Sequence, residues 1–167
     1  TIVDLGNNFA TTESEIMEMG LRLAGTGHMV GLTEPQIMGI ATAMSSVGIN
    51  AEAGGSSFSR VLQKINTEVL SGGKKLKGFA QVAGMSAKDF AAEWKKDPQY
   101  AILDFVYGLE QIKKSGGDVT STLKALGIVS TQEVDTMQRL AGAGGLMHQA
   151  LVKANDAWKA NTALTTE

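Results

Sequence analysis

Apolar residues recur along most of this chain at steps of three and four, which is the spacing of one face of an α-helix. The clearest examples lie in 55–70 and 98–115, and no stretch sustains the strict alternation of a half-buried strand. The pattern predicts an all-α fold, a compact array of about seven short helices. The expected ranges are 12–24, 34–47, 55–70, 76–83, 87–96, 98–115 and 118–126, followed by a last helical region from about 131.

A recurring phrase separates these helices: glycine, one or two apolar residues, and then Ser, Thr or Asn. Gly can adopt the left-handed conformation that follows many helices, and the three polar side chains can accept hydrogen bonds from the free N–H groups of the next helix. Each phrase is therefore interpreted as a tight Gly-capped turn between two helices. The phrase occurs as GLTEPQI at 31–37, GINAEAG at 48–54, GMSAKDF at 84–90 and GIVSTQEV at 127–134.

Several helix starts carry a more specific signal. Gln36 and Glu133 each stand three residues after a capping residue, the spacing of the reciprocal capping box, and Glu15 has the same relation to Thr12. Asp97 precedes a proline, which suits the first position of a helix because no N–H is needed there. We therefore expect Asp97 to cap the helix that follows it.

Composition adds limits to this picture. A chain of 167 residues suits a single helical domain, 1–167, and its start at Thr suggests a fragment of a much longer protein. The last helical region, from about 131, can extend away from the core. Among 20 glycines, Gly20, Gly39 and Gly108 fall inside predicted helices, where a missing side chain lets two helices approach closely.

Charge and cysteine content exclude some classes of site. The net charge is −2, so the whole chain has no electrostatic signature for nucleic acid or anionic lipid, and we predict no specific nucleic-acid binding. There is no Cys, which excludes disulfides and zinc–thiolate sites. No apolar run approaches the roughly 18 residues of a membrane span.

Candidate ligands for metals and phosphates have simpler interpretations. His28 and His148 are far apart in the sequence, and neither has a second ligand at helical spacing. The GGKK stretch lacks the Ser or Thr that follows the lysine of a phosphate-binding loop, so Lys74, Lys75 and Lys77 are interpreted as a solvated turn. No cofactor and no metal is predicted.

Acidic and aromatic residues also give no predicted active site. Glu13, Glu15 and Glu18 cluster where a helix N-terminus favours negative charge. Trp94 and Trp158 could stack on a ligand, but their apolar neighbours favour packing in a core or an interface. Eight Met are compatible either with an adaptable partner surface or with core filling. We predict no catalytic residue and no enzymatic activity.

Two long segments resemble the conserved region of phage tail tape-measure proteins, namely 31–66 and 79–109. Shorter segments follow the same family in the same order: LGNNFATTESEI at 5–16, ALGIVSTQEV at 125–134 and ANDAWKANTAL at 154–164. The ordered combination carries the resemblance, because any single segment would be only a capped helix.

The resemblance implies a structural role in the virion of a phage or prophage. Tape-measure proteins lie in several copies in the lumen of the tail tube, set tail length and support tube assembly. The implied partners are the tail tube protein, tail assembly chaperones, and tail tip or baseplate proteins, together with self-association of the full-length protein. The resemblance also implies a place in the host cytoplasm during assembly, and it allows DNA passage and membrane contact at infection. It transfers no catalytic residue.

Two other functions stay open on the sequence alone. A muralytic, that is peptidoglycan-hydrolysing, domain of a tail protein would need a cleft with converging carboxylates and at least one raised pKa. A generic helical protein-interaction module would need only an exposed surface.

Overall fold

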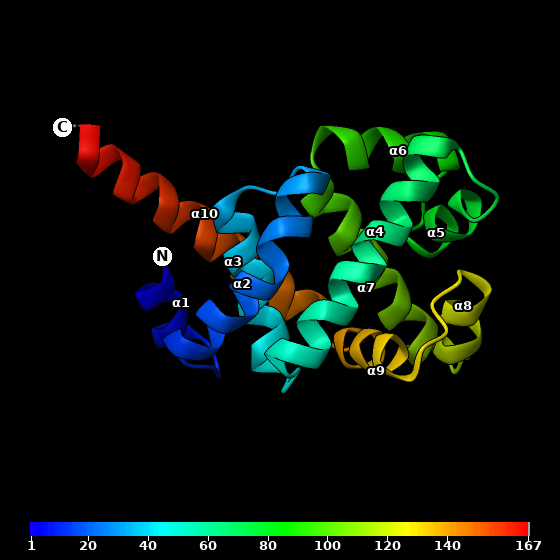
Figure 1. Ribbon diagram of the computed structural model, residues 1–167, viewed down its shortest axis with the longest axis horizontal. Coiled ribbons are helices and arrows are strands. Elements are labelled where there is room, and N and C mark those ends of the chain that lie inside the picture. The colour runs from blue at the N-terminus through cyan, green and yellow to red at the C-terminus, as the bar shows by residue number, and fades with distance from the viewer. Residues whose placement is uncertain (167) are drawn as a thin grey trace.

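The computed structural model describes the backbone of residues 1–166 and the side chains of residues 1–161. That part of the chain forms ten α-helices and one π-helical segment, without a strand (Figure 1). The predicted all-α class is confirmed, whereas the predicted number of helices, about seven, was too low. The elements are α1 (Ile2–Asn8), α2 (Glu13–Val30), α3 (Glu34–Ser46), the π-helical η1 (Ala51–Gly55), α4 (Ser56–Ser71), α5 (Leu76–Val82), α6 (Ala87–Lys96), α7 (Pro98–Lys114), α8 (Val119–Ala125), α9 (Thr131–Leu140) and α10 (Gly144–Thr166).

The count differs because packing forms helices that the local pattern does not mark. α1 has one fully buried side chain, Leu5, and so shows no apolar stripe. The last helical region is two helices, α9 and α10. α2 was expected to stop near Ala24 but continues to Val30 through two glycines. Gly27 suits this continuation, since a Cβ there would lie 2.9 Å from the Ile37 side chain of α3.

The predicted capping boxes at the starts of α2 and α3 are confirmed. Thr12 Oγ1 accepts from the N–H of Glu15 at 3.1 Å, and the Glu15 carboxylate accepts from the N–H of Thr12. Thr33 and Gln36 form the same reciprocal pair. Ser86 caps α6 with a side-chain bond to the third N–H of the helix.

Two other predicted caps differ from the expectation. Ser130 accepts from the N–H of Glu133 as expected, but the Glu133 carboxylate accepts from the Ser130 hydroxyl at 2.8 Å rather than from its backbone N–H. The same carboxylate lies 2.6 Å from Lys64 Nζ. Asp97 makes no side-chain cap bond on α7. Its carboxylate instead accepts from Gln36 Nε2 at 3.3 Å, which ties the start of α7 to α3. In both places the carboxylate also binds a partner that is distant in the sequence.

Glycine serves two purposes in this fold. Some glycines end helices, as Gly31 does after α2 with φ of +101°. Others allow close approach: a Cβ on Gly39 would lie 3.0 Å from Leu151 Cα of α10, and one on Gly108 would meet the Val82 carbonyl oxygen. The glycines with positive φ are Gly31, Gly48, Gly72, Gly84, Gly116 and Gly127.

The helices form two groups (Figure 1). α4 and α7 belong to the second group and also contact helices of the first, α2 and α10 respectively. In the first group α3 packs between α2 and α10, and α1 contacts α2 and α10. In the second group α5, α6 and α7 pack together, while α9 lies on α4 and contacts α8. The C-terminal part of α10 projects from the body beside α1 (Figure 1). No helix of the described chain is both long and apolar enough to cross a membrane.

Candidate functional site

Helix α2 has two apolar faces, and only one of them is buried. Ile16, Met19 and Leu23 point into the core and are at most 2% exposed. Met17 and Leu21 lie on the other face and are 42% and 70% exposed. Surface helices of globular proteins usually carry a single apolar stripe, so the second stripe of α2 is a candidate contact surface.

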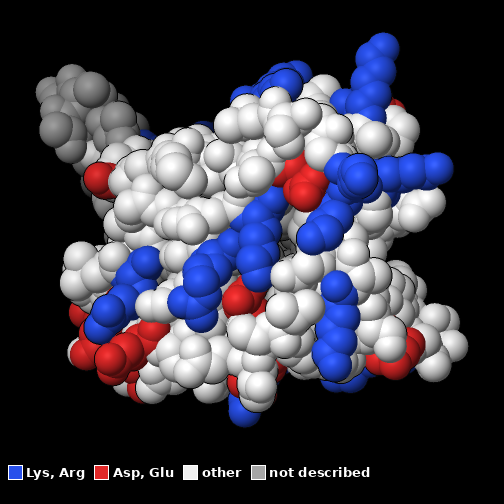
Figure 2. All heavy atoms as spheres, turned by 45° about the vertical axis from the view of Figure 1, so that its right-hand side comes forward, with Lys and Arg blue, Asp and Glu red and all other residues white. Residues whose placement is uncertain are grey.

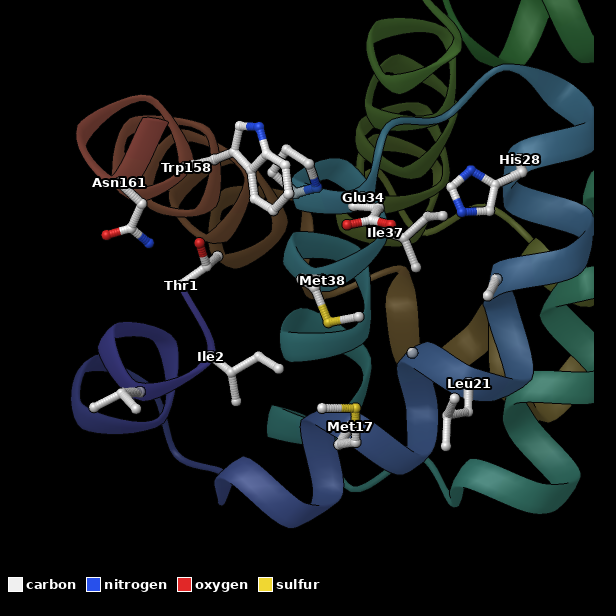
Figure 3. A pocket seen from close by; sticks show the side chains of 14 residues that line it. Thr1, Ile2, Met17, Leu21, His28, Glu34, Ile37, Met38, Trp158 and Asn161 are labelled. Atoms are coloured by element: carbon white, nitrogen blue, oxygen red, sulfur yellow. The ribbon is translucent and has the colours of Figure 1, made fainter. Parts of the chain in front are cut away.

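This second face forms one wall of a groove with a volume of about 550 Å³. The other walls come from α1, α3 and α10, so residues near both ends of the sequence meet here (Figure 3). Trp158 and Asn161 of α10 stand on one side, and Leu21 and His28 of α2 on the other (Figure 3). The lining residues are Thr1, Ile2, Val3, Met17, Gly20, Leu21, Ala24, His28, Glu34, Pro35, Ile37, Met38, Trp158 and Asn161.

Small residues on α2 leave the groove open. Gly20 faces α3, and a Cβ there would lie 2.7 Å from Met38 Cε. The absence of this side chain gives Met38 space between the two helices. Met38 and Met17 are flexible and polarisable, so the apolar surface between α2 and α3 can adapt to the shape of an occupant.

The described lining of the groove contains few charged or titratable side chains. Glu34, in the first turn of α3, is exposed, and His28 is exposed near the end of α2. Among the described lining residues, Glu34 is the only Asp, Glu, Lys or Arg. A mostly apolar surface with a few polar groups is typical of a binding site and offers no nucleophile paired with a base.

Charge is distributed unevenly along the chain, which the net value of −2 conceals. Residues 1–59 contain six Asp and Glu and one Arg, whereas residues 60–124 contain eleven Lys and Arg and seven Asp and Glu. Figure 2 brings the side of α5, α6 and α8 forward and shows many Lys and Arg on that face. Three walls of the groove, α1, α2 and α3, therefore belong to the acidic part of the sequence. The fourth wall, α10, carries Lys153, whose Nζ lies 3.7 Å from Asp4 Oδ2.

A second titratable cluster lies outside the groove, between α6 and α7. Burial raises the pKa of Glu93 to about 7, and the charge of Asp104, a hydrogen bond between these two carboxyl groups and the charge of Asp97 act in the same direction. Glu93 Oε2 is buried and has no hydrogen-bond partner among the described residues. The cluster therefore consists of neighbouring carboxyl groups in which burial favours the neutral form of Glu93.

A third cluster joins α4 to α9. Burial raises the pKa of Glu133, but hydrogen bonds from Lys64 and Ser130 and the charges of Lys64 and Arg60 outweigh it and hold the pKa below its usual value. Lys64 Nζ lies 2.6 Å and Arg60 Nε 3.5 Å from this carboxylate. The Glu133 side chain is nearly buried, so this cluster fixes α9 on α4.

The sequence candidates for metal and phosphate binding remain separate. His28 lies on α2 and His148 on α10, both exposed. In the part of the chain with described side chains, no three His, Cys, Asp or Glu residues are placed to hold a metal ion. Lys74, Lys75 and Lys77 are exposed in and after the turn that follows α4.

The remaining candidates have structural positions. Glu13 and Glu15 lie in the first turn of α2, as predicted. Trp94 is buried and donates from Nε1 to Asn66 Oδ1 at 3.1 Å, in agreement with core packing. Trp158 is 45% exposed and lines the groove, so it is not a core residue.

Sequence reasoning missed the groove, although one signal was available. Ile16, Met19 and Leu23 form the stripe of α2 that faces the core. Met17 and Leu21 form a parallel stripe one position away, and a helix with two such stripes indicates contact on two sides.

One comparison with known proteins is informative. The phage-related minor tail protein family matches residues 1–117, which is more than half of the chain and includes α1 to α7 and three of the four groove walls. No curated protein and no solved structure matches the chain. The chain belongs to the phage-related minor tail protein family.

Proposed function

We propose that this chain is a folded helical module of a tail tape-measure protein. The observation that carries the proposal is the family match over 1–117, which contains both long segments that resemble tape-measure proteins, 31–66 and 79–109. The module would contribute to tail assembly by binding other tail components, and the proposed partners are the tube protein, assembly chaperones and tail tip or baseplate proteins.

The compact fold bears on how such a module contributes to a ruler. A continuous helix of 167 residues would span about 250 Å, whereas a compact chain of this length has a radius of gyration of about 15 Å. The longest helix here has 23 residues. We therefore infer that the folded module does not itself measure tail length, and that it acts at one end of the tape.

An in-frame deletion of residues 31–127 in the encoding phage tests this role. Tails of unchanged length, or failure of tail assembly, would support the proposal. Tails shorter by about 1.5 Å per deleted residue would show that the segment is extended in the tube. Absence of the chain from purified tails, measured by mass spectrometry, would contradict any role as a tail component.

We further propose that the module is not an enzyme. Glu93 has the raised pKa that a muralytic site requires, but the charge of the neighbouring Asp104 and a hydrogen bond between the two carboxyl groups contribute to this rise, so the two groups lie close together. Retaining glycosidases hold their carboxyl groups about 5 Å apart, and inverting ones farther, to flank the bond that is cleaved. A cell-wall turbidity assay tests this proposal: lysis that Glu93→Gln abolishes would overturn it.

A further inference from the structure

We propose that the groove between α1, α2, α3 and α10 binds an amphipathic helix of a partner protein, and that this helix carries basic residues beside its apolar stripe. The proposal concerns contact chemistry and goes beyond the tape-measure role. It is carried by the shape of the groove, by its exposed apolar side chains and by the charge around it.

The spacing of the lining residues on α2 indicates that the occupant is a helix. Met17, Leu21, Ala24 and His28 follow each other at steps of four, three and four. This is the seam along which two helices pack with a repeat of about 3.5 residues. The stripe covers about 16 Å of helix axis, so it can receive about three turns of a partner helix.

The exposed side chains in the groove supply the contact. Leu21, Met17 and Trp158 are 70%, 42% and 45% exposed, and Ile2 and Val3 of α1 lie beside them in the same groove. Isolated exposed apolar residues are ordinary, but a contiguous group in a concave surface marks an interaction site. A helix that inserts apolar side chains at positions i, i+4 and i+7 would cover them.

The negative charge near the groove favours a basic partner helix. Glu34 lines the groove, no Lys or Arg does so among the described residues, and residues 1–59 contain six carboxylates against one Arg. A basic helix would place Lys or Arg near Glu34, the one carboxylate among the described lining residues. A second copy that paired through the same groove would bring two acidic regions together, which opposes association.

The seam between α4 and α9 shows this type of contact within the chain. Arg60 and Lys64 on α4 pair with Glu133 on the docked helix α9, beside buried Ile65 and Met137. At the groove the signs are reversed: the carboxylate Glu34 is on the receiving surface, so the basic residues belong on the incoming helix.

The test uses the whole chain and a designed peptide of about 18 residues, long enough to form a helix on binding. The peptide has Leu at i, i+4, i+7 and i+11 and Lys on both flanks. One control peptide has the same composition with the Leu stripe dispersed around the helix, and another has Glu in place of Lys. Trp158 emission reports occupancy of the groove, with Trp158→Phe as its control, and anisotropy of the labelled peptide gives the affinity.

We expect one peptide to bind per chain. Leu21→Ser should weaken binding at least about tenfold, as for a residue at the centre of an interface. Glu34→Gln should weaken it about threefold, and 0.5 M salt should reduce this difference. Two matched variants should bind like the wild type: Leu70→Ser, an exposed leucine on α4, and Asp89→Asn, a first-turn carboxylate on α6. Circular dichroism checks that each variant is folded.

Several results would overturn the proposal. The dispersed peptide or the Glu peptide could bind as tightly as the designed one. Leu21→Ser and Leu70→Ser could have equal effects. Sedimentation could show that the chain alone forms a dimer that Leu21→Ser dissociates, which would make a second copy the occupant. A long-chain fatty acid could shift Trp158 emission while the peptide does not, which would make the groove a site for acyl chains.

Discussion

Two helices of this chain have a face that can receive a further helix, and only one of these faces is covered. α4 presents Arg60 and Lys64, and α9 lies on it with Glu133 between them. α2 presents Met17 and Leu21, which stay exposed among the described residues. The first contact is internal and contributes to the stability of the fold. The second leaves apolar area in water, where it can contribute to binding.

One small module can therefore use different helix faces for stability and for binding. Arg60 and Lys64 of α4 pair with Glu133 within the chain, whereas Glu34 at the groove is exposed. Changes at the α4–α9 seam or inside the core should therefore alter stability. Changes on the outer face of α2 should alter binding alone.

The largest expected effect comes from the backbone contact that holds one wall of the groove. In Gly39→Val the new side chain would start 3.0 Å from Leu151 Cα and 3.1 Å from the Ala150 carbonyl oxygen, so α10 must move away from α3. We expect a loss of about 3 kcal/mol and a melting temperature lower by about 10 °C. Gly25→Val is the control, because a Cβ at Gly25 would meet nothing within 4 Å. Equal melting temperatures in calorimetry would show that Gly39 is not needed for this contact.

The next effect tests the seam between α4 and α9. Glu133→Ala removes the acceptor for Lys64 and Arg60, whose side chains are 36% and 45% exposed, so solvent reduces the loss. We expect about 2 kcal/mol at pH 7 from urea unfolding. Because the pKa of Glu133 is lowered by folding, its contribution exists above the ordinary value of 4.5 and is lost as the pH falls. The difference between wild type and variant should therefore shrink below pH 4.5, and a constant difference would contradict the assignment.

Substitution of Glu93 should have a smaller effect on stability, and it should stabilise the fold where the previous substitutions destabilise it. Its pKa is raised from 4.5 to about 7, so the folded state binds more protons than the unfolded state between these values. Stability should fall as the pH rises through this window. Glu93→Gln should raise the melting temperature by a few degrees at pH 8 and change it little at pH 4. Glu18→Gln controls for the loss of one negative charge, and a stabilisation by Glu93→Gln that is independent of pH would refute the raised pKa of Glu93.

The smallest effect on stability is expected on the outer face of α2. Leu21→Ala should change the free energy of unfolding by no more than about 0.5 kcal/mol, because Leu21 is 70% exposed. Leu23→Ala, two residues away, should cost about 2–5 kcal/mol, because Leu23 is 2% exposed. Urea unfolding of both variants measures the difference between the two faces. Equal losses would mean that α2 is packed on both sides.

Local signals in the sequence were enough for the helices that have them. Thr12 with Glu15 and Thr33 with Gln36 marked helix starts correctly, because a capping box depends on residues three apart. Asp97 stands at the cap position of α7 but makes no side-chain cap bond. Its carboxylate accepts from Gln99 and from Gln36, which is 61 positions away. A distant partner of this kind leaves no trace in a local pattern.

The groove could not be predicted for the same reason. Its walls include Ile2 near one end of the sequence and Trp158 near the other, and only the packing of α10 against α3 brings them together. The periodicity of α2 indicates only the second apolar face, through Met17 and Leu21. The concave shape and the acidic edge at Glu34 required the fold.

Protection of the groove in the assembled tail tests the central claim most directly. The chain contains no Cys, so Leu21→Cys and Leu70→Cys each introduce a single thiol at an exposed leucine. Maleimide labelling, followed by mass spectrometry of the labelled peptides, compares the free chain with purified tails. We predict that both thiols react in the free chain, and that only the thiol at position 21 becomes protected in tails. Equal labelling of the two positions in tails would contradict the claim that the α2 face is the docking surface.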